Sequence, residues 1–141
     1  GHVRIYEYSS SSWTQLGSDI DGEASFDQSG YSVSLNGDGN IVAIGAPKNS
    51  DKEIDAGHTR VLQFDADSGS WNQLGADIDG ETSEDFSGDS VSLSSDGQIV
   101  AIGAPYNDGN GDDSGHVGSV VSKAGYIDRQ VEIVVATVDC W

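Results

Sequence analysis

The chain has 141 residues, enough for one domain with a hydrophobic core and short for two. It carries 24 Asp and Glu against 6 Lys and Arg, and the net charge of -18 repels nucleic acids and anionic membranes. We therefore expect no nucleic-acid partner, and since no apolar run approaches the ~18 residues of a membrane helix, we expect no membrane insertion. The acidity fits either solubility at high salt or cation binding. Cys140 is the single cysteine, so an intramolecular disulfide is excluded.

In chain order, short β-branched stretches alternate with clusters of Gly, Asp and Ser, which is the pattern of strands joined by tight turns. The expected strands are Val3 to Tyr8, Trp13 to Ile20, Tyr31 to Leu35, Asn40 to Ala46, His58 to Phe64 and Trp71 to Ile78, and a further set begins at Val91. Asp38-Gly39 and Asp96-Gly97 predict hairpins, because Gly accepts the positive φ of the turn. The apolar runs after them, Ile41 to Ala46 and Ile99 to Ala104, lack polar alternation, so we expect both faces of these strands to be covered.

An internal repeat organises the chain. Gly1 to Ala56 aligns with Gly57 to Ser114 almost without gaps, and from Trp13 onward each match lies 58 positions later, as at Trp71. Four strands per period describe one blade of a β-propeller. The sequence therefore predicts an all-β, propeller-like fold of antiparallel four-stranded blades, in an incomplete ring of about two and a half blades.

The predicted organisation is one continuous domain with three parts. These are a half blade over residues 1–28, a full blade over 29–86, and a second blade with a divergent tail over 87–141. The stretch Val131 to Val138 has strand composition and could replace the fourth strand of that last blade.

The spacing of Gly30-Tyr31-Ser32-Val33 and Gly45-Ala46-Pro47, repeated at Gly88-Asp89-Ser90-Val91 and Gly103-Ala104-Pro105, resembles the FG-GAP repeat. This family includes the propeller of integrin α-subunits. The amino-acid sequence of the repeat is similar to that of tandem repeats in large extracellular proteins of marine microbes. The resemblance covers Gly1 to Val117 and implies a propeller fold with adhesion, ligand binding or plain architecture as its function. Ser29 and Ser87 replace the Phe of the family pattern, which we expect to thin the packing there.

The calcium loop of the family is shortened in this chain. Asn36, Asp38 and Asn40 remain in one copy and Asp96 almost alone in the other, without the closing acidic ligand, so we predict plain hairpin turns. The loop from Asn107 to Asp113 is likewise expected to be a turn before it is a metal site.

The better cation candidate is the acidic loop after each Trp strand. Its acids recur at matching positions: Asp19, Asp21, Glu23 and Asp27, then Asp77, Asp79, Glu81 and Asp85. Calcium takes six to eight hard oxygen ligands, and the Gly of the turn lets several carboxylates converge. The alternative is a solvated loop whose Asp side chains accept local backbone N–H bonds. Calcium is the one cofactor that the sequence suggests.

Histidine and tryptophan also recur at fixed repeat positions. His2, His58 and His116 would lie on separate blades, too far apart to share one zinc ion, so we expect a structural role for them. Trp13 and Trp71 are expected to bury apolar area between sheets, with sugar stacking at a propeller rim as the alternative.

No catalytic constellation or phosphate loop stands out, so we predict no enzymatic activity. The predicted function is a non-catalytic extracellular or cell-surface module for structure and adhesion, part of a larger surface protein, filament or oligomer. Its expected partners are neighbouring repeats or further copies of itself, and a protein or glycan surface ligand. A glycan-binding lectin formed by oligomerised blades is the alternative.

Overall fold

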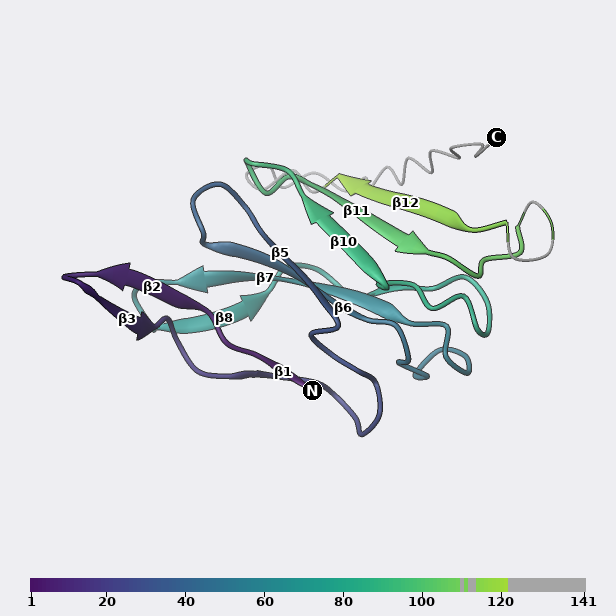
Figure 1. Cartoon of the computed structure of the whole chain (residues 1–141), viewed down its shortest axis with the longest axis horizontal. Helices are drawn as coiled ribbons and strands as arrows, with labels where there is room; N and C mark the ends of the chain where they lie inside the picture. The colour runs from purple at the N-terminus through teal and green to yellow at the C-terminus, as the bar shows by residue number, and fades with distance from the viewer. Residues whose placement is uncertain (110, 112–113, 122–141) are drawn as a thin grey trace.

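The computed structural model describes residues 1–109, 111 and 114–121. This part of the chain contains twelve strands and no helix, and all named strand pairs are antiparallel (Figure 1). The strands are β1 (His2–Val3), β2 (Tyr6–Ser9), β3 (Ser12–Gln15), β4 (Ile20–Asp21), β5 (Ser32–Leu35), β6 (Ile41–Ala46), β7 (His58–Asp65), β8 (Ser70–Gln73), β9 (Ile78–Asp79), β10 (Ser90–Leu93), β11 (Ile99–Ala104) and β12 (His116–Val121). The predicted all-β fold of antiparallel blades is confirmed. None of the described residues forms a helix that could span a membrane.

The central blade is a sheet with the order β5-β6-β7-β8, and β9 pairs with the beginning of β7. All six residues of β6 are buried, because β6 lies between β5 and β7 and both of its faces meet another sheet. The hairpin before β6 closes as a turn. Gly39 has a φ of 70°, and Asn36 Oδ1 accepts hydrogen bonds from the backbone N–H groups of Asn40 and Ile41, each at 3.0 Å.

The first half blade repeats the outer half of the central blade. The pairing of β1 with β4 has the same register as the pairing of β7 with β9. Likewise, the pairing of β2 with β3 has the same register as the pairing of β7 with β8. The expected continuous strands Trp13 to Ile20 and Trp71 to Ile78 are wrong, since each is interrupted near a glycine (Gly17 or Gly75) with a φ of 76°. Val3 to Tyr8 is also split. β6 supports β7 along its other edge, whereas β1 and β2 have no such neighbour in the described part of the chain.

The third sheet has the order β10-β11-β12. β11 repeats the sequence of β6, yet its burial alternates: Val100 and Ile102 are each 4% exposed, whereas Ile99 is 44% exposed. Coverage of both faces is therefore a wrong expectation for β11, because the described residues pack against one face alone. The stretch Val131 to Val138, expected as a further strand, lies outside the described residues.

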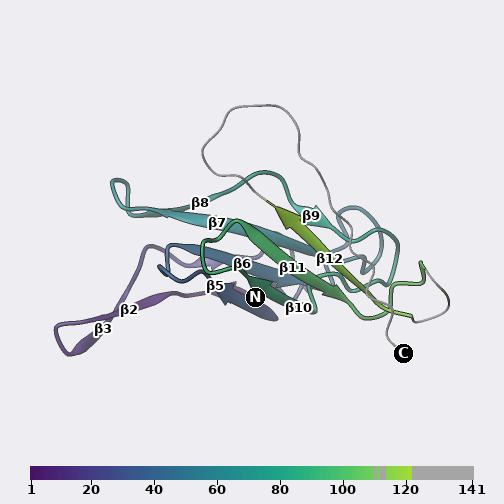
Figure 2. The same ribbon diagram turned by 90° about the horizontal axis from the view of Figure 1, so that it is seen from above.

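Two apolar layers hold the three sheets in sequence. Alternate residues of a strand point to opposite faces, so β6 contributes Val42 and Ile44 to one layer and Ile41 and Ala43 to the other. The first layer joins the half blade to the central blade and contains Val3, Ile5, Ile20, Val42, Ile44 and Leu62. The second joins the central blade to the third sheet and contains Ile41, Ala43, Val61, Val100 and Ile102. Figure 1 shows β5–β8 between β2–β3 and β10–β12, and in Figures 1 and 2 the β2–β3 hairpin projects from the rest.

The two repeated tryptophans have different surroundings. Trp71 packs on the first apolar layer, and its Nε1 donates to the carbonyl of Leu16 at 2.8 Å. Trp13 is 68% exposed and its ring contacts Tyr8, with 5.1 Å between the ring centroids. Burial between sheets is thus confirmed for Trp71 and wrong for Trp13. Leu16 belongs to the preceding sheet, and no described sheet precedes that of Trp13.

Ser29 and Ser87 are buried, at 6% and 7% exposure. A Cβ added to Gly22 would lie 2.8 Å from the Cβ of Ser29, and one added to Gly80 would lie 3.2 Å from the Cβ of Ser87. The packing at both serines is therefore tight rather than thin, because two backbone segments approach closely there.

Candidate metal centre

The second acidic loop closes on a buried aspartate, Asp85, which is 1% exposed. Asp85 Oδ2 accepts from the N–H groups of Glu81 at 3.1 Å and Thr82 at 2.9 Å, and from Asn107 Nδ2 at 3.0 Å. Its Oδ1 accepts from Thr82 Oγ1 at 2.8 Å. Burial alone would raise the pKa of Asp85, but these hydrogen bonds together lower it below the ordinary value of 3.8.

Asp27 closes the first acidic loop in the same way and is 5% exposed. Its Oδ2 accepts from the N–H of Ala24 at 3.0 Å and from Asn49 Nδ2 at 3.2 Å. Asn49 and Asn107 hold matching repeat positions, so in both loops an Asn side chain donates a hydrogen bond to the buried Asp. Two of the eight predicted cation ligands are thus hydrogen-bond acceptors that shape the loop.

Asp19 forms an ion pair on the rim of the half blade. Arg4 Nη2 lies 2.8 Å from Asp19 Oδ2, and Gln15 Nε2 donates to Asp19 Oδ1 at 2.8 Å. The hydrogen bonds from Arg4 and then from Gln15 lower the pKa of Asp19 to about 2. Asp19 therefore stays ionised and paired.

Arg60 matches Arg4 in the repeat but has other partners. Its side chain is only 10% exposed, because the acidic loop of the preceding sheet covers it. Nη2 donates to the carbonyl of Asp21 at 2.6 Å, and Nη1 lies 3.5 Å from Glu23 Oε1. Arg60 is thereby turned toward the half blade, away from Asp77, the counterpart of Asp19.

Asp77 is oriented by a neighbour in its own sheet and faces a histidine. Gln73 Nε2 donates to Asp77 Oδ1 at 2.6 Å, while Asp77 Oδ2 lies 3.9 Å from His58 Nδ1. Glu23 Oε2 lies 3.8 Å from the same nitrogen. The side chain of His58 is 2% exposed, and its Nδ1 has no hydrogen-bond partner among the described residues.

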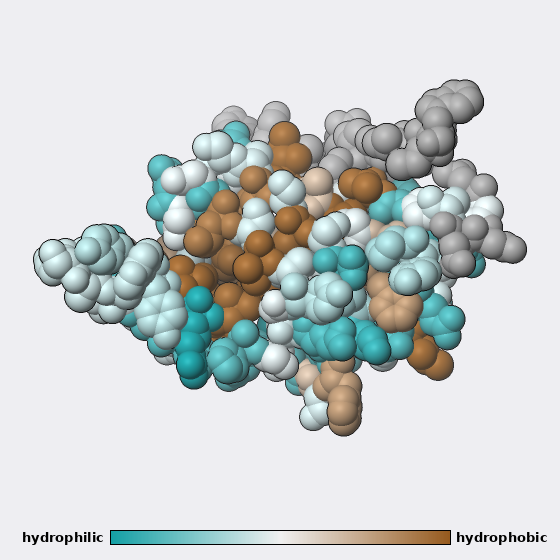
Figure 3. Space-filling model, in the orientation of Figure 1, coloured by the Kyte–Doolittle hydropathy of each residue, from teal (hydrophilic) through white to brown (hydrophobic). Residues whose placement is uncertain are grey.

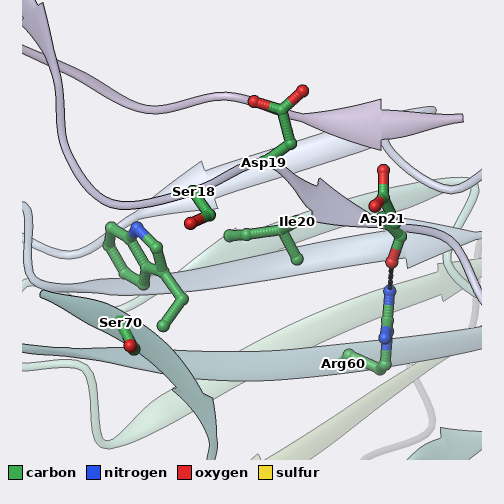
Figure 4. Close-up of a pocket in the computed structure, with 7 residues that line it drawn as sticks. Ser18, Asp19, Ile20, Asp21, Arg60 and Ser70 are labelled. Carbon is green, nitrogen blue, oxygen red and sulfur yellow. Dashed lines mark hydrogen bonds between the residues drawn. The ribbon is translucent and has the colours of Figure 1, made fainter. Parts of the chain in front are cut away.

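A pocket of about 290 Å³ lies between β4 and the strands β7 and β8 (Figure 4). Arg60, which contacts Glu23, also lines this pocket. It is lined by Ser18, Asp19, Ile20, Asp21, Arg60, Ser70 and Trp71. Figure 4 shows Arg60 reaching the backbone oxygen of Asp21 at one end of the pocket, with Ser70 at the other. An indole beside carboxylates and hydroxyls offers both an apolar surface and polar acceptors.

The structure does not gather the four acids of either loop around one point. Among the residues described, one set of at least three potential metal ligands has all donor atoms within 4.8 Å of one another: Glu23, His58 and Asp77. Asp21 and Asp79 are exposed, and Glu81 Oε2 lies 3.3 Å from Asn107 Nδ2. Calcium binding by the eight predicted acids stays a prediction.

Sequence reasoning missed His58 and Arg60. His58 begins the third strand of its blade and Asp77 lies in the expected fourth, so the strand order alone could have placed them side by side. The contact with Glu23 could not be read in this way, since it depends on how two sheets pack.

Comparison with known proteins agrees with this architecture. No curated protein matches the chain. Residues 74–117 match the family model of the FG-GAP repeat, and this segment includes β9, β10 and β11 and the beginning of β12. This segment is therefore similar to the FG-GAP repeat, the family that the spacing of the Gly-Ala-Pro motifs resembles.

Proposed function

We propose that the chain is a non-catalytic structural and adhesion module of an extracellular or cell-surface protein, and that its blades continue into neighbouring repeats or further copies. One observation carries this proposal. Two blade faces expose apolar side chains at positions that the interface between the central and third sheets covers. One is the part of the central blade's first face that the half blade leaves open, and the other is the free face of the third sheet. Open blade faces of this kind favour association.

We define the leading face by Val33 and Leu35 on β5. These two residues are 53% and 46% exposed, respectively. Their repeat counterparts, Val91 and Leu93, pack on the second apolar layer. In Figure 3 a hydrophobic patch lies in the region where Figure 1 draws β5.

The trailing face, defined by Ile99 on β11 and Val117 on β12, is 44% and 45% exposed at these two side chains. Their counterparts Ile41 and Thr59 are 5% and 0% exposed. The trailing face therefore matches a surface that the third sheet covers within the chain. The leading face of another repeat can pack there, head to tail.

Sedimentation velocity over a range of concentrations tests this association, at a salt concentration that screens the acidic charge. We expect the wild-type chain to associate, and Leu35→Lys and Ile99→Asp each to weaken it. Ile54→Asp is the matched control, because Ile54 is 70% exposed in the loop between β6 and β7. A wild-type chain that is monomeric at about 1 mM, where an association of about 4 kcal/mol would be visible, contradicts the proposal.

Glycan binding is a second candidate, and the pocket beside Trp71 favours it. A half-buried indole can stack on a sugar ring while Asp19 and Asp21 accept from its hydroxyls. A glycan array separates the two functions. Binding that Trp71→Ala removes and Trp13→Ala retains would support a lectin, whereas an array without signal would leave structure and adhesion.

We also propose calcium as the ion of the acidic loops, supported by the net charge of -18 and by the exposed carboxylates of Asp79 and Glu81. A ligand bound only by the native state stabilises it, by about 2.7 kcal/mol at a hundredfold excess over Kd. Melting curves in calcium, in chelator and in sodium chloride at matched ionic strength provide the test. A calcium shift no larger than that of sodium contradicts the proposal.

A further inference from the structure

We propose that Glu23, His58 and Asp77 bind a divalent first-row transition metal ion, such as Zn²⁺, across the interface between the half blade and the central blade. The site is separate from the hairpin loops. Glu23 lies in the loop between β4 and β5, His58 begins β7, and Asp77 lies between β8 and β9. A bound ion would therefore tie the two sheets together.

The nitrogen ligand determines the class of ion. Imidazole with carboxylates suits zinc and its neighbours, whereas calcium prefers six to eight oxygen ligands. His58 Nδ1 is buried, has no hydrogen-bond partner among the described residues, and is directed between two carboxylate oxygens at 3.8 and 3.9 Å. A buried polar nitrogen in this condition lacks the partner that such groups ordinarily have.

The distances lie close to those of a bound site. Metal–ligand bonds of ~2.0–2.2 Å in a tetrahedron place ligand atoms about 3.3–3.6 Å apart. The two separations from His58 Nδ1, 3.8 and 3.9 Å, exceed this by a few tenths of an ångström, and all three ligand atoms lie within 4.8 Å of one another. The Glu23 and Asp77 side chains are 32% and 30% exposed, so they can close around an ion from solvent while water takes the fourth position.

The neighbouring side chains hold the two carboxylates in position. Gln73 binds Oδ1 of Asp77, and Arg60 lies beside Oε1 of Glu23, so in each case the other oxygen faces His58. The charge of Arg60 opposes a cation, but two carboxylates outweigh it. Arg60 also donates a hydrogen bond from Nη2 to the carbonyl of Asp21 in the half blade.

Among the residues that the structure describes, this arrangement occurs at one interface. Asp19, the counterpart of Asp77, is paired with Arg4, and Glu81, the counterpart of Glu23, lies beside Asn107 instead. Position 118, the counterpart of Arg60, is Gly. Asp19 and Glu81 therefore serve as controls for Asp77 and Glu23, because each has the same residue type at the matching position of the repeat.

Calorimetric titration of chelator-treated protein with Zn²⁺ tests the site. We expect one ion per chain, and an affinity reduced at least about tenfold in Glu23→Gln and in Asp77→Asn. The control variants Glu81→Gln and Asp19→Asn should bind within about twofold of wild type. His58→Gln removes the nitrogen ligand. Because His58 is buried, the variants at the two partly exposed acids, Glu23 and Asp77, remain the primary test.

Thermal melting gives a second readout, because an ion between two sheets should stabilise both. We expect Zn²⁺ to raise the Tm of the wild type and of Asp19→Asn but not that of Asp77→Asn. Three results would overturn the proposal: no saturable zinc binding, equal losses in Asp19→Asn and Asp77→Asn, or displacement of zinc by calcium at equal free concentration.

Discussion

Replacing Asp85 with Ala should destabilise the chain more than the same change at its repeat counterpart, Asp27. Asp85 accepts four hydrogen bonds and is 1% exposed, whereas Asp27 accepts two from Ala24 and Asn49 and is 5% exposed. A hydrogen bond to a charged acceptor contributes about 1.5–3 kcal/mol, and water can reach some of the donors that remain. We therefore expect losses of about 3 kcal/mol for Asp85→Ala and about 2 kcal/mol for Asp27→Ala.

Urea unfolding followed by tryptophan fluorescence measures both losses. The pH dependence provides an internal check, because hydrogen bonding holds the folded-state pKa of Asp85 below 3.8. The stabilisation by Asp85 is then present above the unfolded-state pKa and is lost as the pH falls through the folded-state pKa. The stability difference between wild type and Asp85→Ala should therefore shrink from pH 5 toward pH 2. An equal or larger loss for Asp27→Ala, or a difference that does not change with pH, would refute this reasoning.

Two further predictions concern Asp19 of the half blade and the glycines that follow β3 and β8. NMR titration should give Asp19 a pKa of about 2. Any stabilisation by Asp19 therefore persists above about pH 3.8 and is lost toward pH 2. Arg4→Gln should return the pKa of Asp19 toward 3.8, and an unchanged pKa would contradict the ion pair. Gly17→Ala and Gly75→Ala should both cost about 1 kcal/mol for a φ of 76°. Gly17→Ala should cost about 1 kcal/mol more in urea unfolding, because only its added Cβ would lie 2.9 Å from Trp71 Cδ1. Equal losses would mean that Trp71 moves aside freely.

The repeat made the architecture predictable. Because Trp71 follows Trp13 at the same position of the next period, the strands of one copy predict those of the other, and the two copies indeed share their pairing registers. The turn at Asp38-Gly39 was equally predictable, since Gly readily adopts the positive φ that Gly39 has in this hairpin. These features depend on local sequence.

Features that depend on the neighbouring sheet were not predictable in this way. Trp13 and Trp71 are identical in type and position, yet only Trp71 has a preceding sheet whose Leu16 carbonyl accepts its N–H. Arg4 and Arg60 differ for the same reason. The candidate metal centre arises from this difference. The acidic loop of the half blade covers Arg60 and binds its guanidinium group, so Arg60 does not pair with Asp77 as Arg4 pairs with Asp19.

Mixing two variants tests the continuation of the blade stack most directly. Leu35→Lys blocks the leading face and leaves the trailing face of Ile99 intact, whereas Ile99→Asp does the reverse. If repeats pack head to tail, each variant alone is monomeric and an equimolar mixture forms a 1:1 dimer that grows no further, while the wild type forms larger species. Sedimentation equilibrium distinguishes these states. A mixture that is as monomeric as its separate components, or a single variant that assembles like the wild type, would contradict the account.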